Sequence, residues 1–206
     1  MAFVGWVNPV YPPSHFTVGK QGLPTLRKMK VNSVTRKNLQ WLWLAALVIA
    51  LDLASKAFVS SHMFLGESIP VLPFFSWTLA HNYGAAFSFL HDAGGWQRWF
   101  FGAIAVVVSA GIVFWLYKLP GSGARFLGCA LALVLGGALG NLYDRMTLGY
   151  VVDFIHVHYG TWHFPAFNIA DSGITVGAIM LVIDSLLFEK AREQQRQAAA
   201  DGKAHV

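Results

Sequence analysis

Two isolated aspartates carry the strongest indication of chemistry in this sequence. Asp153 lies within the apolar run 150–155, and Asp171 ends the segment 167–171. Two carboxyl groups held close together cannot both ionise cheaply, so they share one proton and their apparent pKa values separate. Such a pair supplies a base that deprotonates water and an acid that polarises a peptide carbonyl. The pattern predicts an aspartyl hydrolase if the fold brings the two side chains together.

Each aspartate also has an ordinary structural interpretation. Asp153 could pair with Arg145. Asp171, followed by Ser172, could cap the N-terminus of a helix, where a side-chain acceptor stabilises by about 0.5–2 kcal/mol. A helix cap alone would explain Asp171, so the catalytic interpretation depends on the pair.

A second group of charged residues occupies apolar surroundings and favours structural roles. Asp52 and Lys56 are four residues apart, hence on one helix face, and are expected to form an ion pair that orients the outer segments. Lys56 could instead extend its ammonium toward the outer membrane interface, and a proton relay is a further alternative. Arg145 can hold a carboxylate, while Asp144 can fix Arg145 or the backbone of an outer segment.

Other polar residues give weaker signals. Asp184 is expected on nearly the opposite helix face from Asp171, and no role follows from its position. His156 and His158 alternate as strand neighbours, but no carboxylate or cysteine with ligand spacing accompanies them, so no metal site is expected. The sequence contains no phosphate-binding loop, serine-nucleophile elbow or zinc-protease motif.

Membrane-spanning helices are the elements that would position these residues. The 206-residue chain is 55% hydrophobic and only 12% charged, whereas a soluble domain has about 25% charged residues. A spanning helix requires about 20 mostly apolar residues. Four stretches qualify, at about residues 39–59, 99–117, 125–143 and 172–188. The sequence therefore predicts an all-α membrane protein with four transmembrane helices.

The basic residues predict the orientation of these helices. Two long segments, 60–98 and 144–171, fall on one side, and both termini and the short turn 119–123 fall on the other. Of the 15 Lys and Arg residues, six precede residue 40, two flank the short turn and four lie in the C-terminal tail. Because basic residues accumulate on the cytoplasmic side, both termini are expected inside and the long segments outside. This distribution also argues against a nucleic-acid-binding face.

The remaining segments complete the expected organisation. Residues 69–90 combine Phe, Trp and Val with Pro, Asn and Gly, which predicts a small extracytoplasmic β-structure. Gly128, Ala132, Gly136 and Gly140 recur every fourth residue and predict close helix packing. We expect an irregular extension at 1–30, the membrane domain at 31–190 and a cytoplasmic polar tail at 191–206.

Five short segments occur in a fixed order along the chain. They are DLASK at 52–56, NYGAAF at 82–87, GGALGNLYDR at 136–145, VVDF at 151–154 and FNIAD at 167–171. Together they resemble the lipoprotein signal peptidases, also called signal peptidase II, over about residues 39–190. Each segment alone would be weak evidence, but their order and their placement relative to the expected helices make the resemblance specific.

The resemblance implies a multi-pass aspartic endopeptidase of the bacterial inner membrane, with its active site at the periplasmic face. Its substrates would be prolipoproteins cut before a cysteine that carries a diacylglyceryl group, and it would need no metal or other cofactor. Membrane lipids and globomycin-type inhibitors are further expected partners, and a monomer is expected. The family's catalytic pair falls on Asp153 and Asp171, and its supporting residues fall on Asn82, Gly84, Asn141, Asp144, Arg145, Asn168, Asp52 and Lys56.

A small transporter or channel is the alternative function. It would use the Asp52–Lys56 pair, Asp153 and Asp171 as an ion or proton path. The four unequal spans show no internal repeat of the kind that many transporters carry. The acids also gather near one end of the expected helices and do not follow a path across them.

Overall fold

The computed structural model describes residues 40–84, 94–119 and 124–188, together with 190, 192–194 and 197 of the tail. The expected extension at 1–30 and residues 85–90 of the expected β-structure lie outside the described residues. The proposed division into three regions therefore stays a prediction.

Four helices confirm the expected spans. They are α2 (Trp41–His62), α3 (Gln97–Lys118), α4 (Arg125–Thr147) and α5 (Ile169–Leu187), and each is long and apolar enough to cross a membrane. At 1.5 Å per residue, helices of 19 to 23 residues are about 28–35 Å long. This length matches the hydrocarbon core of a bilayer, which is about 30 Å thick.

The start of α5 differs from the expectation. The helix begins at Ile169 rather than at Ser172, and its N-cap is Asn168 rather than Asp171. The side-chain oxygen Oδ1 of Asn168 accepts the backbone N–H of Asp171 at 2.8 Å. Asp171 therefore lies in the first helical turn, so the cap interpretation of this residue was wrong and its carboxylate is available for other contacts.

Helix α4 is the centre of the bundle. It packs against each of the other three helices. In the most apolar stretch of α4, 61% of the residues are buried, whereas the corresponding share is 17–28% in the other three helices. Small residues allow this contact. Gly140 belongs to the small-residue pattern predicted from the sequence, whereas Gly137 lies outside it. A Cβ atom at Gly137 would overlap the backbone carbonyl oxygen of Ala170 on α5, and one at Gly140 would lie 2.7 Å from Oδ2 of Asp52 on α2. The backbones of α2, α4 and α5 thus meet closely near the end of α4.

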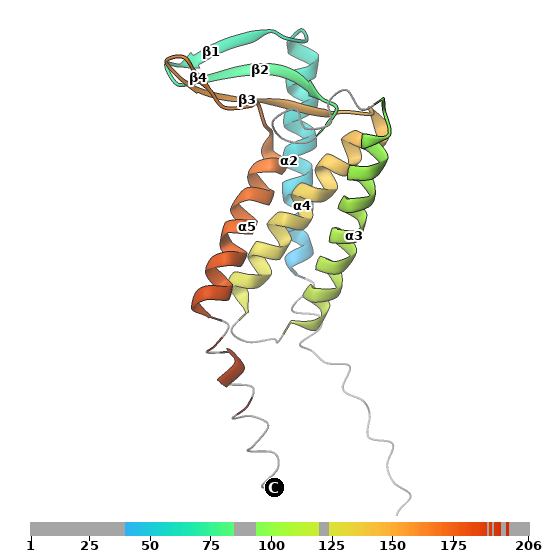
Figure 1. The fold of residues 1–206 in the computed structure, drawn as a ribbon, viewed down its shortest axis with the longest axis vertical. Helices are drawn as coiled ribbons and strands as arrows, with labels where there is room; N and C mark the ends of the chain where they lie inside the picture. Colours follow the sequence, from blue (N-terminus) through green and yellow to red (C-terminus); the bar gives the residue numbers. More distant parts are fainter. Residues whose placement is uncertain are drawn as a thin grey trace, which may run out of the picture. The chain divides into compact units, whose positions relative to one another are not determined.

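A four-stranded antiparallel sheet lies over one end of the bundle (Figure 1). Its strands, in spatial order, are β1 (Ser68–Leu72), β2 (Phe75–Asn82), β3 (Val151–Tyr159) and β4 (Trp162–His163). The β2–β3 pairing joins the two long segments of the sequence, since β2 follows α2 and β3 follows α4. The small β-structure is confirmed, and its second half comes from the segment after α4.

A small apolar core attaches the sheet to the helices. Val59 of α2, Leu79 of β2 and Val152 and Phe154 of β3 form this core and are all at most 4% exposed. Beside this core, a β-bulge between Trp77 and Ala80 shifts the register of β2 against β3. Because the core holds both strands on the helices, the end of β2 and the start of β3 lie close to the end of α4 and the start of α5.

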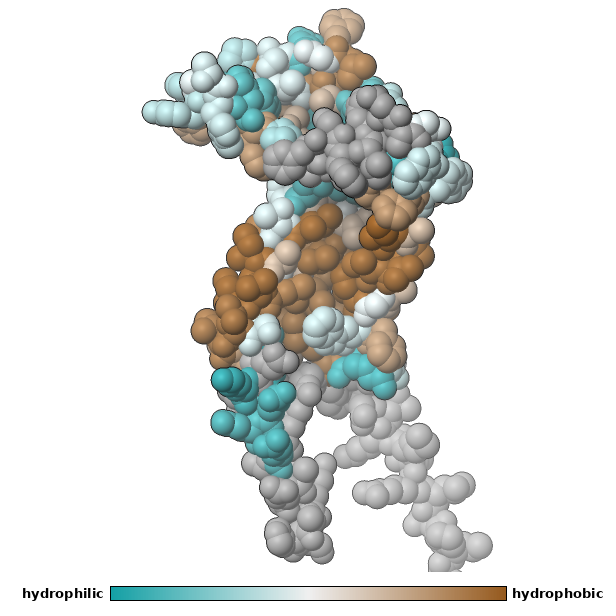
Figure 2. Space-filling model, in the orientation of Figure 1, coloured by the Kyte–Doolittle hydropathy of each residue, from teal (hydrophilic) through white to brown (hydrophobic). Residues whose placement is uncertain are grey.

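The surface of the helices is apolar. Figure 2 shows a hydrophobic band along the helices, below a paler surface over the sheet. Large side chains such as Trp43, Leu47 and Phe58 of α2 are at least half exposed. Because apolar surface of this extent is unfavourable in water, lipid is its natural environment.

Candidate active site

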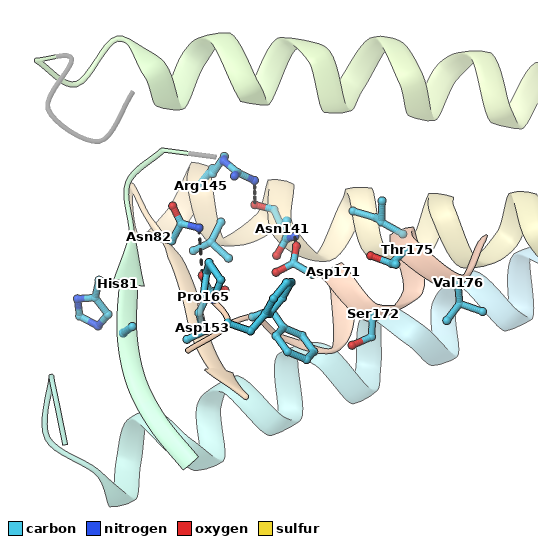
Figure 3. Close-up of a pocket in the computed structure, with 16 residues that line it drawn as sticks. His81, Asn82, Asn141, Arg145, Asp153, Pro165, Asp171, Ser172, Thr175 and Val176 are labelled. Carbon is cyan, nitrogen blue, oxygen red and sulfur yellow. Dashed lines mark hydrogen bonds between the residues drawn. The ribbon is translucent and has the colours of Figure 1, made fainter. Parts of the chain in front are cut away.

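A cavity of about 710 Å³ opens where the sheet meets the helices. Its walls come from the ends of β2 and β3, the segment 164–167 before α5, the last turns of α4 and the first turns of α5 (Figure 3). Asp153 and Asp171 both line this cavity, together with Asn82, Asn141 and Arg145. Residues from five separate segments of the chain therefore meet in one place.

Asp153 is the third residue of β3, is buried, and accepts hydrogen bonds from two asparagine amides. Its Oδ1 accepts from Nδ2 of Asn168 at 2.7 Å, and its Oδ2 accepts from Nδ2 of Asn82 at 3.0 Å. The residue is only 3% exposed. Burial is the main cause that raises the pKa of Asp153 from 3.8 to about 7, and the negative charge of Asp171 is the next. The hydrogen bonds from the two asparagine amides act in the opposite direction, because they favour the ionised form. A carboxyl group with this pKa can hold or release a proton near neutral pH.

Asp171 accepts a corresponding hydrogen bond from an asparagine amide of α4. Its Oδ1 accepts from Nδ2 of Asn141 at 2.7 Å, as Figure 3 shows. Asn141 lies on α4, six residues before the helix ends at Thr147. The close contact at Gly137 brings this part of α4 next to the first turn of α5.

The two asparagines are themselves connected, which fixes the orientation of their amides. Oδ1 of Asn141 accepts from Nζ of Lys56 at 2.9 Å and from Nδ2 of Asn168 at 3.2 Å. Because the carboxamide oxygen faces these donors, its Nδ2 is the atom that faces Asp171. Each aspartate is thus held by an amide whose own direction is set by buried partners.

Lys56 lies beneath the asparagines and is almost completely buried. Its Nζ is 2.7 Å from Oδ2 of Asp52 and 2.9 Å from Oδ2 of Asp144, and the residue is 3% exposed. The expected Asp52–Lys56 ion pair is confirmed. The alternative in which Lys56 extends to the membrane interface is wrong, because three acceptors inside the protein, counting Asn141, match the three protons of the ammonium.

The two acids bound to Lys56 also hold the chain at the cavity. Oδ1 of Asp52 accepts the backbone N–H of Ala170 at 2.8 Å, at the start of α5. Oδ2 of Asp144 accepts the backbone N–H of Val152 at 3.1 Å, next to Asp153. Asp52 and Asp144 therefore tie the backbones beside both cavity aspartates to α2 and α4.

Arg145 lines the cavity and is hydrogen-bonded to the backbone of Gly84. The guanidinium group donates to the backbone oxygen of Gly84 at 3.2 Å and to that of Asn141 at 3.4 Å. Its carbon Cζ lies 5.5 Å from the ring centre of Phe101 on α3. Among the described residues, no ion pair joins Arg145 to Asp153, so the alternative in which they pair is wrong.

Sequence reasoning missed one wall of the cavity and one ion pair. The wall is the segment 164–167, of which only Phe167 belongs to one of the five ordered segments of the sequence. Residues 164–166 are two apolar residues and a proline, which the sequence does not distinguish from an ordinary loop. Asp184 is buried near the far end of α5 and pairs with Arg192 of the tail, away from the cavity. In the described part of the chain, no group of three or more His, Cys, Asp or Glu side chains could hold a metal ion.

Comparisons with known proteins agree on one family. The family model described as "Signal peptidase (SPase) II" matches residues 44–187. The chain is 56% identical over 164 residues to a lipoprotein signal peptidase of Acinetobacter baylyi, covering 80% of this chain and 91% of the relative. It is 59% identical over 157 residues to a lipoprotein signal peptidase of Pseudomonas aeruginosa, covering 75% and 92%.

Solved structures support the same fold. A structure described as a bacterial membrane enzyme at 2.3 Å resolution matches with a TM-score of 0.64 and 34% identity, covering 71% of this chain and 87% of the other. A second, at 1.9 Å resolution, matches with a TM-score of 0.61 and 33% identity, covering 73% and 94%. The chain belongs to the signal peptidase II family and is therefore a multi-pass membrane peptidase. The transporter or channel alternative is not favoured.

Proposed function

We propose that the cavity is the active site at which this peptidase removes signal peptides from lipid-modified prolipoproteins, with Asp153 and Asp171 as the catalytic pair. The observation that carries this assignment is the bonded pair Asn141–Asn168, whose amides hold the two carboxylates at one cavity. The family model and the names of the relatives support prolipoproteins as substrates.

The proposed reaction is hydrolysis of one peptide bond by the two carboxyl groups. The ionised carboxylate takes a proton from water, whose oxygen attacks the scissile carbonyl carbon. The protonated carboxyl group of the other residue donates to the carbonyl oxygen, and the C–N bond then breaks as the leaving nitrogen takes up a proton. A pKa of about 7 at Asp153 supports a pair that keeps one shared proton at neutral pH.

The cavity also fits a substrate that is anchored in the membrane. Ile174, Thr175 and Val176 continue its lining along α5, and Val176 is 50% exposed on the apolar surface. A lipid-modified chain could therefore approach from the bilayer and place its peptide bond at the aspartates. We propose cleavage before the lipidated cysteine, with no metal or other cofactor and with the enzyme acting as a monomer. The same cavity would bind globomycin-type inhibitors.

The charge distribution supports the sidedness that we propose. With most basic residues at the termini and the short turn, the sheet and the cavity would face the periplasm and the termini the cytoplasm of a bacterial inner membrane. Labelling with a membrane-impermeant maleimide, applied to intact spheroplasts and to inverted membrane vesicles, with one cysteine introduced at Tyr159 in the sheet, tests this orientation. Labelling only from the cytoplasmic side would contradict it.

Reconstitution tests the catalytic assignment. The purified protein, Asp153→Asn and Asp171→Asn are placed in proteoliposomes with a diacylglyceryl-modified prolipoprotein, and cleavage is followed by gel shift and mass spectrometry. Each variant should lose at least about three orders of magnitude in rate, since removing one member of a catalytic pair abolishes its joint action.

Glu67→Gln is the matched control, because it removes an acid of the outer segment that bonds to the backbone N–H of Phe64, away from the cavity. This variant should cleave at the rate of the unmodified protein. Full cleavage by either aspartate variant, with the fold intact by circular dichroism, would overturn the assignment.

A further inference from the structure

Three histidine rings gather on one face of the sheet. His156 and His158 alternate on β3, and His163 of β4 pairs with His158 across the strands. The ring centres lie 5.2–5.6 Å apart. Ser76 of β2, which is opposite His156 in the register, bonds to Nε2 of His158 at 2.9 Å. The three rings are therefore next to one another and to hydroxyl groups of β2.

Hydrogen bonds join this cluster across all the strands. Nε2 of His156 lies 3.2 Å from Nδ1 of His163, which connects β3 to β4. Nδ1 of His156 lies 3.2 Å from the hydroxyl of Thr78 on β2, and that hydroxyl lies 2.8 Å from the hydroxyl of Ser68 on β1. One chain of side-chain bonds thus runs from β1 to β4 and ends at His163.

His163 is the last residue before the cavity wall. β4 contains only Trp162 and His163, and the chain continues directly into the segment 164–167, which lines the cavity. The far end of this wall is fixed, because Phe167 forms a β-bridge with Ile155. The near end begins at the backbone bond from Phe164 to Val157, 2.9 Å long, beside the histidines. The position of the near end therefore depends on whether β4 stays paired with β3.

We propose that His156 and His163 form a pH-sensitive clasp that positions the near end of this cavity wall. The clasp is closed while at most one of the two rings is charged, and it opens when both are charged. In this inference the two histidines are positioning residues. The effect on substrate rests on the function proposed above, whereas the opening of the clasp does not.

The bond between the two rings explains this response. A hydrogen bond between two imidazole nitrogens needs a proton on one and a lone pair on the other. One added proton is tolerated, because His156 can then donate from both nitrogens to Thr78 and to His163. A second proton leaves N–H groups facing each other and places two positive charges on adjacent rings.

The surroundings of the clasp favour the neutral state near pH 7. The hydroxyls of Ser68 and Thr78 face it from β1 and β2, and His158 is the titratable neighbour on β3. Burial, and next the charges of His163 and His158, lower the pKa of His156. Because the closed form binds protons less readily than the open form, it loses stability as the pH falls below the ordinary histidine value of about 6.5.

Hydrogen–deuterium exchange of the full-length protein in detergent tests the clasp. Exchange of the peptide covering Trp162–Phe167 is measured at pH 7.5 and 5.5 and corrected for intrinsic rates. For opening linked to one proton, the opening constant should rise about tenfold per pH unit below the histidine pKa. His163→Gln keeps a polar side chain but cannot become charged, so its exchange should not respond to pH. His62→Gln, which replaces a histidine stacked on Phe58 at the end of α2, should respond like the unmodified protein.

Two further measurements separate this inference from the peptidase assignment. Asp153→Asn should keep the pH response of exchange although its activity is lost. In the active protein, KM should rise between pH 7.5 and 5.5, and this rise should be absent in His163→Gln. An unchanged pH response of exchange in His163→Gln would overturn the clasp, whereas full activity of Asp153→Asn would overturn the catalytic pair alone.

Discussion

Asn168 donates from Nδ2 to Oδ1 of Asn141 at 3.2 Å, so the amides that hold the two cavity aspartates are bonded to each other. Asn168 precedes α5, and Asn141 is in α4. A shift of either residue would therefore move the donor of its own aspartate and weaken the orientation of the other. The two carboxyl groups are positioned as a unit, and the predictions below separate the contributions to that unit.

Asn168 has two functions that substitution can separate. Its oxygen caps α5, and its Nδ2 donates to Asp153. Asn168→Ala should lose the cap, at about 0.5–2 kcal/mol of the free energy of unfolding. It should also lose about 10- to 100-fold in kcat/KM, because a hydrogen bond to a charged group contributes about 1.5–3 kcal/mol. Asn168→Ser should recover the stability but not the activity, since serine caps helices but does not replace the amide donor.

Thermal unfolding by circular dichroism and cleavage in proteoliposomes measure the two effects separately. Recovery of activity together with stability in Asn168→Ser would mean that the amide donor to Asp153 is dispensable.

Lys56 compensates two buried acids at once. Lys56→Met should destabilise the protein by about 3–5 kcal/mol, because it leaves the carboxylates of Asp52 and Asp144 without their counter-ion. Lys118→Met is the matched control, as this exposed lysine at the end of α3 lies over the ring of Phe114 and should change stability little. Chemical unfolding in detergent measures both. Equal stability of the two variants would show that the buried ion pairs contribute no net stabilisation.

The contact between α4 and α5 tolerates no side chain at Gly137. Gly137→Ala should destabilise by about 1–3 kcal/mol, because the new methyl group must displace the carbonyl of Ala170 and, with it, the helical turn that carries Asp171. Activity should fall with stability. Gly111→Ala on α3 is the control, since an added Cβ there has nothing within 4 Å and helix propensity favours alanine. Activity of Gly137→Ala equal to that of Gly111→Ala would contradict the close contact.

The raised pKa of Asp153 predicts how the activity changes with pH. A group whose pKa rises from 3.8 to about 7 keeps its proton until near neutrality. Above that pH the pair loses its shared proton and no acid remains, so kcat should fall about tenfold per pH unit. Folding stability should also decline between about pH 4 and 7, because the native state binds this proton more tightly than the unfolded state.

Pre-steady-state cleavage across pH 5–9 measures the activity profile, and unfolding of Asp153→Asn provides the stability baseline without this titration. A rate that is flat to pH 9 would contradict a proton shared at this site.

The helices could be predicted from the sequence to within a few residues, because their apolar length and small-residue spacing are local properties. The residue that caps α5 could not be predicted. Asp and Asn are both favoured caps, and the choice of Asn168 over Asp171 depends on bonds to residues of β3 and α4. The pairing of β2 with β3 also depends on the helix packing that brings the two long segments together.

The candidate site could be predicted as a set of residues but not as a network. Spacing gave the Asp52–Lys56 pair, since these residues share one helix. The contacts of Lys56 with Asp144 and Asn141 cross from α2 to α4, and no sequence interval indicates them. Residues 164–166 of the wall carried no signal, because their role comes from their position and not from chemically reactive side chains.

The central position of α4 has a consequence for how this sequence can diverge. In the most apolar stretch of α4, 61% of the residues are buried, whereas in that of α3 only 22% are buried. Mutations in α3 that exchange one apolar residue for another meet mostly lipid, so most of its positions should accept them. In α4, the same exchanges meet backbone atoms of α2 and α5 and disturb the residues of the cavity. Under random mutagenesis with selection for peptidase activity, substitutions should therefore accumulate in α3, whereas residues 136–141 of α4 should stay nearly unaltered.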